Sequence, residues 1–336
     1  MAQTTFGDIS RSGAAYVVAN ALAHAEPIIV LQKFGQITPM PKNKGEKIIY
    51  RRPVPFAVAT TPLTEGVTPT AKKMEYVRVE ATMQEYGDVV QHSSKMAELA
   101  AEPSGNVALQ DISMLLGEQA AETMEILTYG VIKAGTNVFY NTNAITSRAN
   151  VNGALTIGRQ QAITRSLKAQ RGKKITSILD GSIKVGTKPV EAAFIAFAHT
   201  DCEYDIRQMA GFIPVAQYGS MKPVCPEEIG VVNDVRYVIS PLLTAFADAG
   251  ATSSTMVSTT GTNADVYPII YIAKDAFGVV PFAGKEAIMP SVIAADQISK
   301  SDMLGQRGYA GWRTWFSALI LNQAWLARLE VAATKL

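Results

Sequence analysis

A turn-rich segment between two runs of β-forming residues constrains the fold of this chain more than any other feature. The segment spans residues 60–70 and lies between runs at 47–58 and 74–90. The second run alternates apolar and polar residues, which is the period of a half-buried strand. The first run contains Pro53 and Pro55, and proline cannot donate to a β-ladder, so it predicts an edge strand or a projecting ribbon. The whole unit is predicted to be a two-stranded hairpin, with arms of about 15 residues that each reach about 50 Å.

Such a hairpin needs a partner, because isolated two-stranded ribbons are only marginally stable in water. Its apolar face must be covered by its own domain or by a neighbouring subunit. A ribbon that reaches one neighbour in head-to-tail fashion makes a heterologous contact, and such contacts close into rings when the rotation allows. Rings joined at their edges give a shell. The hairpin is therefore the main argument from the sequence for assembly.

The strongest helix of the chain is predicted over residues 106–134. Apolar residues recur there at three- and four-residue steps, Asn106 is a suitable N-cap, and Gly135 is a suitable C-terminal stop. A helix of this length spans about 42 Å, which is longer than most globular helices. Two interpretations remain open: a core helix of an ordinary domain, or a backbone helix that supports a flat, extended subunit.

The rest of the chain reads as a mixture of strands, short helices and loops. Residues 251–264 are almost all Ser, Thr, Gly, Ala and Asn, so they predict an exposed, mobile loop. The other expectations are helices at 12–25, 156–170 and 202–209, strands at 192–198, 266–273 and 277–282, a strand–turn–strand at 228–240, a loop at 137–152 and an apolar strand from 305 onward.

Composition narrows the function classes. The 336 residues include 31 basic and 29 acidic ones, a net charge of +2, so the chain lacks the electrostatic footprint of a tight nucleic-acid binder. The two cysteines, Cys202 and Cys225, suit a reducing compartment. The most membrane-like stretch, residues 14–31, is interrupted by polar residues and a proline and does not predict a membrane span. We expect a protein that is soluble and intracellular where it is made.

Catalytic, cofactor and metal sites are not expected. The three histidines share no motif, and the alternation of His199 with Asp201, Glu203 and Asp205 lacks a calcium-binding loop. The nearest approach to a phosphate-binding loop lies at 181–188, where Thr187 precedes Lys188 and so reverses the order that such a loop requires. The paired carboxylates Glu227 and Glu228 lie in a proline-bounded loop and are predicted to be solvated.

A set of short motifs, in order along most of the chain, resembles the major capsid proteins of tailed phages of the coliphage N-four type, which carry the Hong Kong 97-type shell fold. The Ser/Thr-rich stretch at 251–264 departs from the pattern. The matching motifs are Thr61-Pro62-Leu63-Thr64-Glu65-Gly66-Val67-Thr68-Pro69, Gln84-Glu85-Tyr86-Gly87-Asp88, Leu116-Gly117-Glu118-Gln119-Ala120-Ala121-Glu122-Thr123, Glu228-Ile229-Gly230, residues 271–278, and Gly305-Gln306-Arg307-Gly308 with Gly311-Trp312.

The resemblance implies an α+β chain divided into the parts of that shell fold. These parts are an N-terminal arm (1–42), an extended E-loop hairpin (43–92), a P-domain (93–190) with its spine helix at 106–134, an A-domain (191–304), and a return to the P-domain (305–336). It also implies two sets of site residues. The E-loop tip, a subunit interface, would comprise Pro62, Leu63, Thr64, Glu65, Gly66, Val67, Thr68 and Pro69, and the base of the P-domain and E-loop would comprise Gln306, Arg307, Gly308, Gly311 and Trp312.

The function that the resemblance implies is a major capsid protein without enzymatic activity. Copies would assemble in the host bacterial cytoplasm into hexamers and pentamers of an icosahedral virion shell around double-stranded DNA, without sequence-specific contact. Scaffold, portal and decoration proteins are the further partners, and no membrane is involved. Two alternatives stay open: an encapsulin-like nanocompartment with the same fold, and an enzyme of unrelated fold built on the 181–188 loop.

Overall fold

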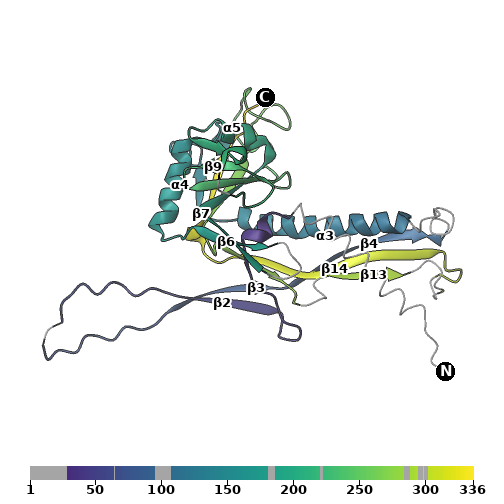
Figure 1. Cartoon of the computed structure of the whole chain (residues 1–336), viewed down its shortest axis with the longest axis horizontal. Coiled ribbons are helices and arrows are strands. Elements are labelled where there is room, and N and C mark those ends of the chain that lie inside the picture. Colours follow the sequence, from purple (N-terminus) through teal and green to yellow (C-terminus); the bar gives the residue numbers. More distant parts are fainter. Residues whose placement is uncertain are drawn as a thin grey trace.

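The computed structural model of the chain describes residues 29–63, 65–94, 107–180, 186–219, 222–283, 288–293, 298 and 302–336. The helix predicted at 12–25, the N-cap Asn106 and most of the 181–188 loop lie outside these residues. The described chain has few helices and many strands. It consists of a compact body, a long flat layer that extends from the body, and a hairpin that projects away from both (Figure 1).

The body is built around an eight-stranded mixed sheet in the order β5-β15-β11-β7-β10-β9-β8, with β6 paired to β7. The strand β11, in the middle of this sheet, is a continuous apolar run because every one of its residues is buried. The helices α4 (Ile157–Ala169) and α5 (Glu203–Arg207) belong to the body. The strands are β5 (Val138–Tyr140), β6 (Ile175–Asp180), β7 (Gly186–Ala198), β8 (Phe212–Pro214), β9 (Glu228–Val232), β10 (Val235–Ile239), β11 (Tyr267–Ile272) and β15 (Leu326–Val331).

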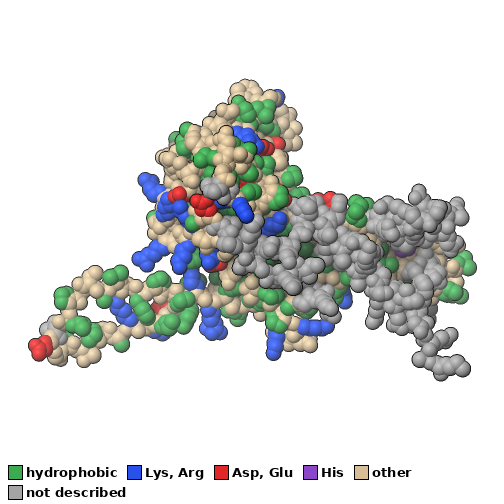
Figure 2. All heavy atoms as spheres, viewed as in Figure 1, with side chains coloured by type: hydrophobic (Ala, Val, Ile, Leu, Met, Phe, Trp, Pro, Cys, Tyr) green, Lys and Arg blue, Asp and Glu red, His purple; other side chains and the backbone are tan. Residues whose placement is uncertain are grey.

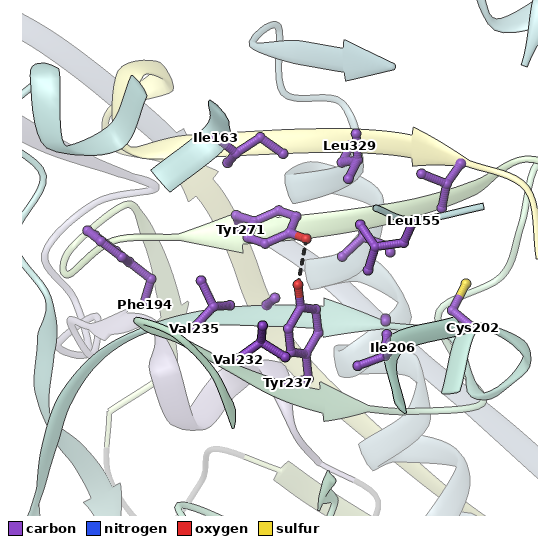
Figure 3. Packing of buried hydrophobic residues seen from close by; sticks show 14 of the residues in the cluster. Leu155, Ile163, Phe194, Cys202, Ile206, Val232, Val235, Tyr237, Tyr271 and Leu329 are labelled. Atoms are coloured by element: carbon purple, nitrogen blue, oxygen red, sulfur yellow. Dashed lines mark hydrogen bonds between the residues drawn. The ribbon is translucent and has the colours of Figure 1, made fainter. Parts of the chain in front are cut away.

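The core of the body contains a pair of buried tyrosines. The hydroxyl groups of Tyr237 and Tyr271 lie 2.9 Å apart, and Tyr237 also donates to Oε1 of Gln160 on α4 at 3.0 Å (Figure 3). Ile163 and Leu167 of α4 pack into the same apolar cluster. A buried hydroxyl needs a partner, so this small polar network fixes how α4 lies on the sheet.

The flat layer is a five-stranded sheet covered by the long helix α3 (Val107–Lys133). The helix predicted at 106–134 is thus confirmed over its described part. Leu116 and Ala120 of α3 pack on Ala310 and Trp312 of the sheet, which is why the helix carries an apolar stripe. The strands are β1 (Gln36–Ile37), β4 (Gln84–Ser93), β12 (Phe277–Pro281), β13 (Ile288–Ile293) and β14 (Arg307–Ile320), with β14 in the centre.

The projecting hairpin is formed by β2 (Lys47–Pro53) and β3 (Tyr76–Thr82), which pair antiparallel over their full lengths. The prediction of one strand over 74–90 is wrong. Met83 interrupts it, because its side chain turns into the subunit and its N–H donates to the carbonyl of Glu46 at 3.0 Å. The chain then enters β4, which pairs with β14 instead of with β2. The paired arms are therefore seven residues long and not about 15.

The division of the chain between the two large sheets does not coincide with the predicted domain boundaries. The chain crosses between the body and the flat layer several times, so neither part is one continuous segment. The body contains β5, β6 and α4, which come from the predicted P-domain. The flat layer contains β12 and β13, which come from the predicted A-domain. The body sheet also contains β15, which comes from the predicted return to the P-domain.

Residues 251–264 form an irregular loop, as predicted, but the loop is tied to the body. Oδ1 of Asp248 accepts hydrogen bonds from the backbone and hydroxyl of Thr260 at 3.1 and 2.9 Å, and Asp265 accepts one from Thr259 at 2.9 Å. Ala264, at its end, is fully buried. The hydroxyl-rich composition thus supplies donors to two aspartates that flank the segment. Among the described residues, no helix combines the length and apolar character that a membrane crossing requires.

Candidate subunit interface

Beyond the paired strands, residues 54–75 form a ribbon that leaves the subunit and exposes apolar side chains. Phe56, Leu63 and Val67 are 57%, 78% and 64% exposed, and Val58 and Met74 are exposed as well. Hydrophobic side chains recur along the projecting ribbon (Figure 2). Among the described residues nothing covers this row of apolar groups. Exposed apolar surface of this kind marks an interaction site.

The predicted tip residues lie at the far end of this ribbon, except Thr64, which is outside the described residues. Gly66 has a φ of +77°, a conformation that residues with a side chain rarely adopt, so the turn at the tip requires glycine. The exposed Glu65 places a negative charge at the turn. Lys72 donates to the carbonyl of Ala57 at 3.0 Å and links the two arms. The tip therefore has a defined shape while remaining in solvent.

The two faces of the hairpin have different environments. Ile48, Tyr50, Val79 and Ala81 point to the subunit and pack on a cluster that contains Met40, Met83, Val280 and Leu319. Alternate residues of both strands point outward and are exposed. Because side chains alternate along a strand, one face anchors the hairpin and the other is free. The anchored face sets the direction in which the ribbon leaves the body.

A half-open groove of about 580 Å³ lies beside this anchor. Met83, Met289 and Trp315 contribute to its apolar wall, and its charged lining residues are Lys42, Glu46 and Arg313. No serine, threonine, cysteine or histidine is among the described residues that line it. The groove therefore offers an apolar surface with three charged side chains at its lining.

The residues predicted as the base of the P-domain and E-loop lie on or next to β14, at the end that is remote from the hairpin. Arg307 and Gly308 pair with Ser93 and His92, whereas the hairpin joins β4 at Gln84, which pairs with Phe316. The backbone carbonyl of Gln306 accepts from Ser94 at 3.0 Å. These residues therefore hold β4 on β14, and the hairpin is anchored elsewhere.

Trp312 and Gly311 fix the contact between the helix and the sheet. The indole Nε1 of Trp312 donates to Oε1 of Gln119 at 3.2 Å, and Nε2 of Gln119 donates to Oδ2 of Asp88 at 2.7 Å. The hydrogen bond from Gln119, together with one from the backbone of Val89, lowers the pKa of the exposed Asp88 carboxyl. A Cβ at Gly311 would lie 2.7 Å from the carbonyl of Asp88, so glycine allows the two strands to approach.

Sequence reasoning missed the outward face of α3. Leu115 and Ile126 are 60% and 51% exposed, and Glu122 lies between them on the same side of the helix. The recurring apolar residues predicted an amphipathic helix, but the stripe is wider than the part that packs on β14. The width of the apolar stripe could have indicated this exposed face, because a helix that packs on one sheet needs apolar residues only on the side that faces the sheet.

Two buried carboxylates were also missed. Oε1 of Glu125 on α3 accepts from the backbone N–H groups of Val30 and Leu31 at 3.1 and 2.8 Å, and burial raises the pKa of this carboxyl to about 7. Glu125 lies within the buried stripe of α3, so its position in the helical pattern could have predicted that this carboxylate is buried. The predicted solvated state of Glu228 is wrong: it is buried, where it accepts from the hydroxyl of Tyr218 and lies 3.5 Å from Nη1 of the buried Arg236.

Of the residues considered for a metal site, His199 and Asp201 lie together, with Nδ1 3.3 Å from Oδ2, but the other two carboxylates point to other partners. Asp201 accepts from Tyr267, Glu203 pairs with Arg207, and Asp205 accepts from Thr334. Within the described ranges, no group of three or more His, Cys, Asp or Glu side chains is placed to hold a metal ion. Thr187 and Lys188 lie in the strand β7, paired with β6, and so do not form a phosphate-binding turn. Both cysteines are buried free thiols.

A subunit that exposes an apolar ribbon beside a flat, helix-covered layer has the features of a structural assembly protein. Comparison with known proteins identifies which assembly. Residues 104–309 match the family described as phage capsid protein, and because this is more than half of the 336 residues, the chain belongs to that family. No curated protein sequence gives a significant match.

Solved structures of similar fold are also phage capsid proteins. The capsid protein of Ralstonia phage GP4 has a TM-score of 0.65 at 10% identity, over 92% of this chain and 90% of that one. The capsid protein of cyanophage Pam1 has a TM-score of 0.61 at 12% identity, over 92% of each chain. That of Helicobacter pylori bacteriophage KHP40 has a TM-score of 0.55 at 10% identity, over 90% and 88%. The chain is thus a major capsid protein, with a structural role in forming the icosahedral shell of a phage head.

Proposed function

We propose that this capsid protein has the Hong Kong 97-type arrangement of parts and is related to the capsid proteins of the coliphage N-four type. In this arrangement the hairpin is the E-loop, α3 is the spine helix of the P-domain, and the body carries the A-domain. One observation carries the proposal: the ribbon at 54–75 leaves its own subunit with its apolar side chains uncovered. Such a segment gains stability only when a second copy covers it.

The proposed domain boundaries follow the sheets. The E-loop ends at Met83 instead of at residue 92, because β4 belongs to the sheet of β14. The P-domain then contains α3 and the five-stranded sheet, and the A-domain contains the eight-stranded sheet with α4 and α5. Residues 62–69 at the tip are the subunit interface, and residues 306–312 position β4 and α3 within the subunit.

Head-to-tail contact through the ribbon would place copies around a common axis. With the A-domain bodies at the centre, six copies give a hexamer and five give a pentamer, and edge contacts between these rings close the shell. Apolar burial contributes about 25 cal/mol per Å², so many individually weak contacts are sufficient for a stable shell. The family match favours this phage shell over an encapsulin-like compartment.

The remaining partners follow from the chemistry of the chain. Its net charge of +2 suits a container that encloses double-stranded DNA without sequence-specific contact. Scaffold, portal and decoration proteins are proposed as further partners. We propose assembly in the host bacterial cytoplasm and a final location in the virion, where the protein acts without catalysis.

Deletion of residues 60–70 tests this proposal. The variant should remain folded, because these residues lie outside the packed clusters, but it should form monomers or rings and no stable shells. Sedimentation velocity and negative-stain electron microscopy separate these states. Normal shells from the deleted protein would overturn the E-loop assignment.

Two matched double substitutions refine the same test. Leu63→Ser with Val67→Ser removes apolar surface from the tip, whereas Thr61→Ser with Thr68→Ser changes the same segment but retains its polarity. The first pair should impair shell formation and the second should not. Equal behaviour of the two pairs would show that the ribbon does not act through apolar burial.

A further inference from the structure

A basic patch lies at the C-terminal end of α4. Residues 157–174 contain six basic residues and no acidic residue, whereas the whole chain has a net charge of only +2. Lys and Arg side chains gather on the side of the body where α4 lies (Figure 1, Figure 2). We define the α4 patch as six basic and two acidic residues with a net charge of +4: Arg165, Lys168, Arg171, Lys173, Lys174 and Lys274 with Asp234 and Asp275.

Side-chain and backbone contacts hold the α4 patch together. The ammonium groups of Lys168 and Lys174 both donate to the carboxylate of Asp234, the second at 2.9 Å. The backbone N–H of Lys274 donates to the carbonyl of Lys173 at 2.9 Å. Residues from α4, from the turn between β9 and β10, and from the segment after β11 therefore form one surface.

Most of the positive charge in the α4 patch is not compensated. Four of its cations are exposed and have neither an ion pair nor a side-chain hydrogen bond among the described residues: Arg165, Arg171, Lys173 and Lys274. The helix dipole favours cations in the last turn of a helix, which accounts for Lys168 but not for the cations before and beyond that turn. The stability of the helix therefore does not explain the patch as a whole.

The surroundings of the α4 patch are polar. Among the described residues, no large apolar side chain between positions 127 and 203 is exposed. The exposed neighbours on and after α4 include Gln161 and Gln170. The core of a protein–protein interface is enriched in aromatic and other apolar residues, whereas nucleic-acid phosphates are bound by Lys and Arg with the help of polar side chains. The chemistry of the patch therefore favours a polyanion over a protein surface.

The dimensions of the patch suit a DNA strand. Gln161, Arg165 and Lys168 recur at four- and three-residue steps on one face of α4, so the row is about 10 Å long. One strand of B-DNA carries one phosphate per about 3.4 Å of helix axis, so the row covers about three phosphates. The cations beyond the end of the helix extend this surface.

We propose that the α4 patch binds the phosphate backbone of the double-stranded DNA that the shell encloses. The inference rests on the proposed function, in which the shell surrounds DNA, and it adds the surface of the subunit that the DNA meets. Contacts to phosphate carry no sequence information, which suits a container for a whole genome. Each patch binds weakly, and the many copies in a shell act together on one DNA molecule.

Charge removal tests the proposal with the full-length, unassembled protein. The triple variant Arg165→Gln, Arg171→Gln and Lys173→Gln keeps polar side chains at exposed positions but removes three positive charges. Fluorescence anisotropy measures the binding of a short DNA duplex of arbitrary sequence between about 50 and 200 mM salt. Affinity at the lower salt should fall by roughly tenfold or more, and the slope of log K against log salt should become less steep by about 2.7, since each phosphate contact contributes about 0.9.

Two further variants make the test specific to the patch. Asp234→Asn removes a negative charge beside Lys168 and Lys174 and should strengthen binding. The control variant makes the same change in net charge as the triple variant, but at dispersed exposed positions, so it should leave the salt slope nearly unchanged: Lys44→Gln, Lys222→Gln and Lys335→Gln.

The outcomes separate this proposal from its alternatives. Unchanged DNA affinity in the triple variant would overturn it, as would an equal loss in the triple and control variants, because that loss would reflect net charge alone. If the triple variant kept its DNA affinity but formed no shells in sedimentation velocity, the patch would contact another copy of the chain instead. Deletion of residues 60–70 leaves the patch intact, so the deleted protein should still bind DNA even where it forms no shells. The proposed function and this proposal can therefore fail separately.

Discussion

The indole of Trp312 on β14 donates a hydrogen bond to the side chain of Gln119 on α3, at 3.2 Å. The same glutamine donates to Asp88 on β4 at 2.7 Å. One amide therefore links the long helix to two strands of the flat layer, in a part of the subunit where Trp312 is buried against Leu116 and Ala120. A flat layer of this kind depends on such links, because α3 is the helix that covers it among the described residues.

Gln119→Met should destabilise the unassembled subunit by about 1–3 kcal/mol, since it leaves the partly buried indole N–H without a partner. Methionine retains length and helix propensity, so the lost hydrogen bonds dominate. Urea unfolding measures the change. Gln161→Met, at an exposed site on α4, is the control and should stay within about 0.5 kcal/mol. The pKa of Asp88 should also rise in Gln119→Met, because its principal hydrogen bond is lost. An unchanged pKa would show that Gln119 does not hold this carboxylate in solution.

Gly87→Ala and Gly130→Ala should have opposite effects. At Gly87 a Cβ would lie 2.5 Å from the carbonyl of Trp312, so β4 would have to move away from β14, at a cost of about 1–3 kcal/mol. At Gly130, in α3, a Cβ meets no atom within 4 Å, and alanine is favoured over glycine in a helix by about 0.5–1 kcal/mol. Thermal unfolding of the two variants measures whether each substitution raises or lowers the stability of the subunit. A stabilised Gly87→Ala variant would contradict the close packing of these strands.

The elements with strong local patterns were predictable from the sequence. The helix at 107–133 follows from apolar spacing, and the strand–turn–strand at β9 and β10 follows from two short apolar runs. The prolines at 53 and 55 correctly indicated that the first arm of the hairpin leaves the body. In each case a few neighbouring residues determine the outcome, so no knowledge of distant contacts is required.

The features that were missed depend on distant residues. The alternation of 74–90 continues through Met83, and only the pairing of β4 with β14, more than 200 residues later, shows that the strand changes its partner. Glu228 reads as a loop carboxylate, but it is buried in β9, where its partners are Arg236 on the paired strand β10 and Tyr218 from the preceding segment. The outward face of α3 reads as core because Leu115 and Ile126 continue the apolar stripe, although both are exposed in the subunit. Periodicity reports an apolar face but does not identify its partner.

Tyr237→Phe tests the polar network in the core of the body. The substitution removes the hydroxyl that contacts both Gln160 and Tyr271 and leaves the buried Oε1 of Gln160 without this donor, so the loss should be about 1–3 kcal/mol. Tyr309→Phe is the matched control, because the partly buried Tyr309 has no hydrogen bond to its hydroxyl among the described residues. Urea unfolding should separate the two variants. Equal stabilities would show that the tyrosine pair does not contribute to the body.

The stability of the unassembled subunit should fall as the pH rises from about 4.5 to about 7, through Glu125. Burial raises the pKa of this carboxyl from 4.5 to about 7, although the backbone N–H groups of Val30 and Leu31 favour its ionised form. The folded state therefore binds more protons than the unfolded state in this window, and the loss is complete above it, at on the order of 3 kcal/mol. Glu125→Gln removes the titration while retaining an acceptor for both N–H groups. The variant should match the wild type at low pH and exceed its stability at pH 8, and thermal unfolding at the two pH values measures the difference. If the difference in stability between Glu125→Gln and the wild type were the same at both pH values, Glu125 would not change its charge within the folded subunit.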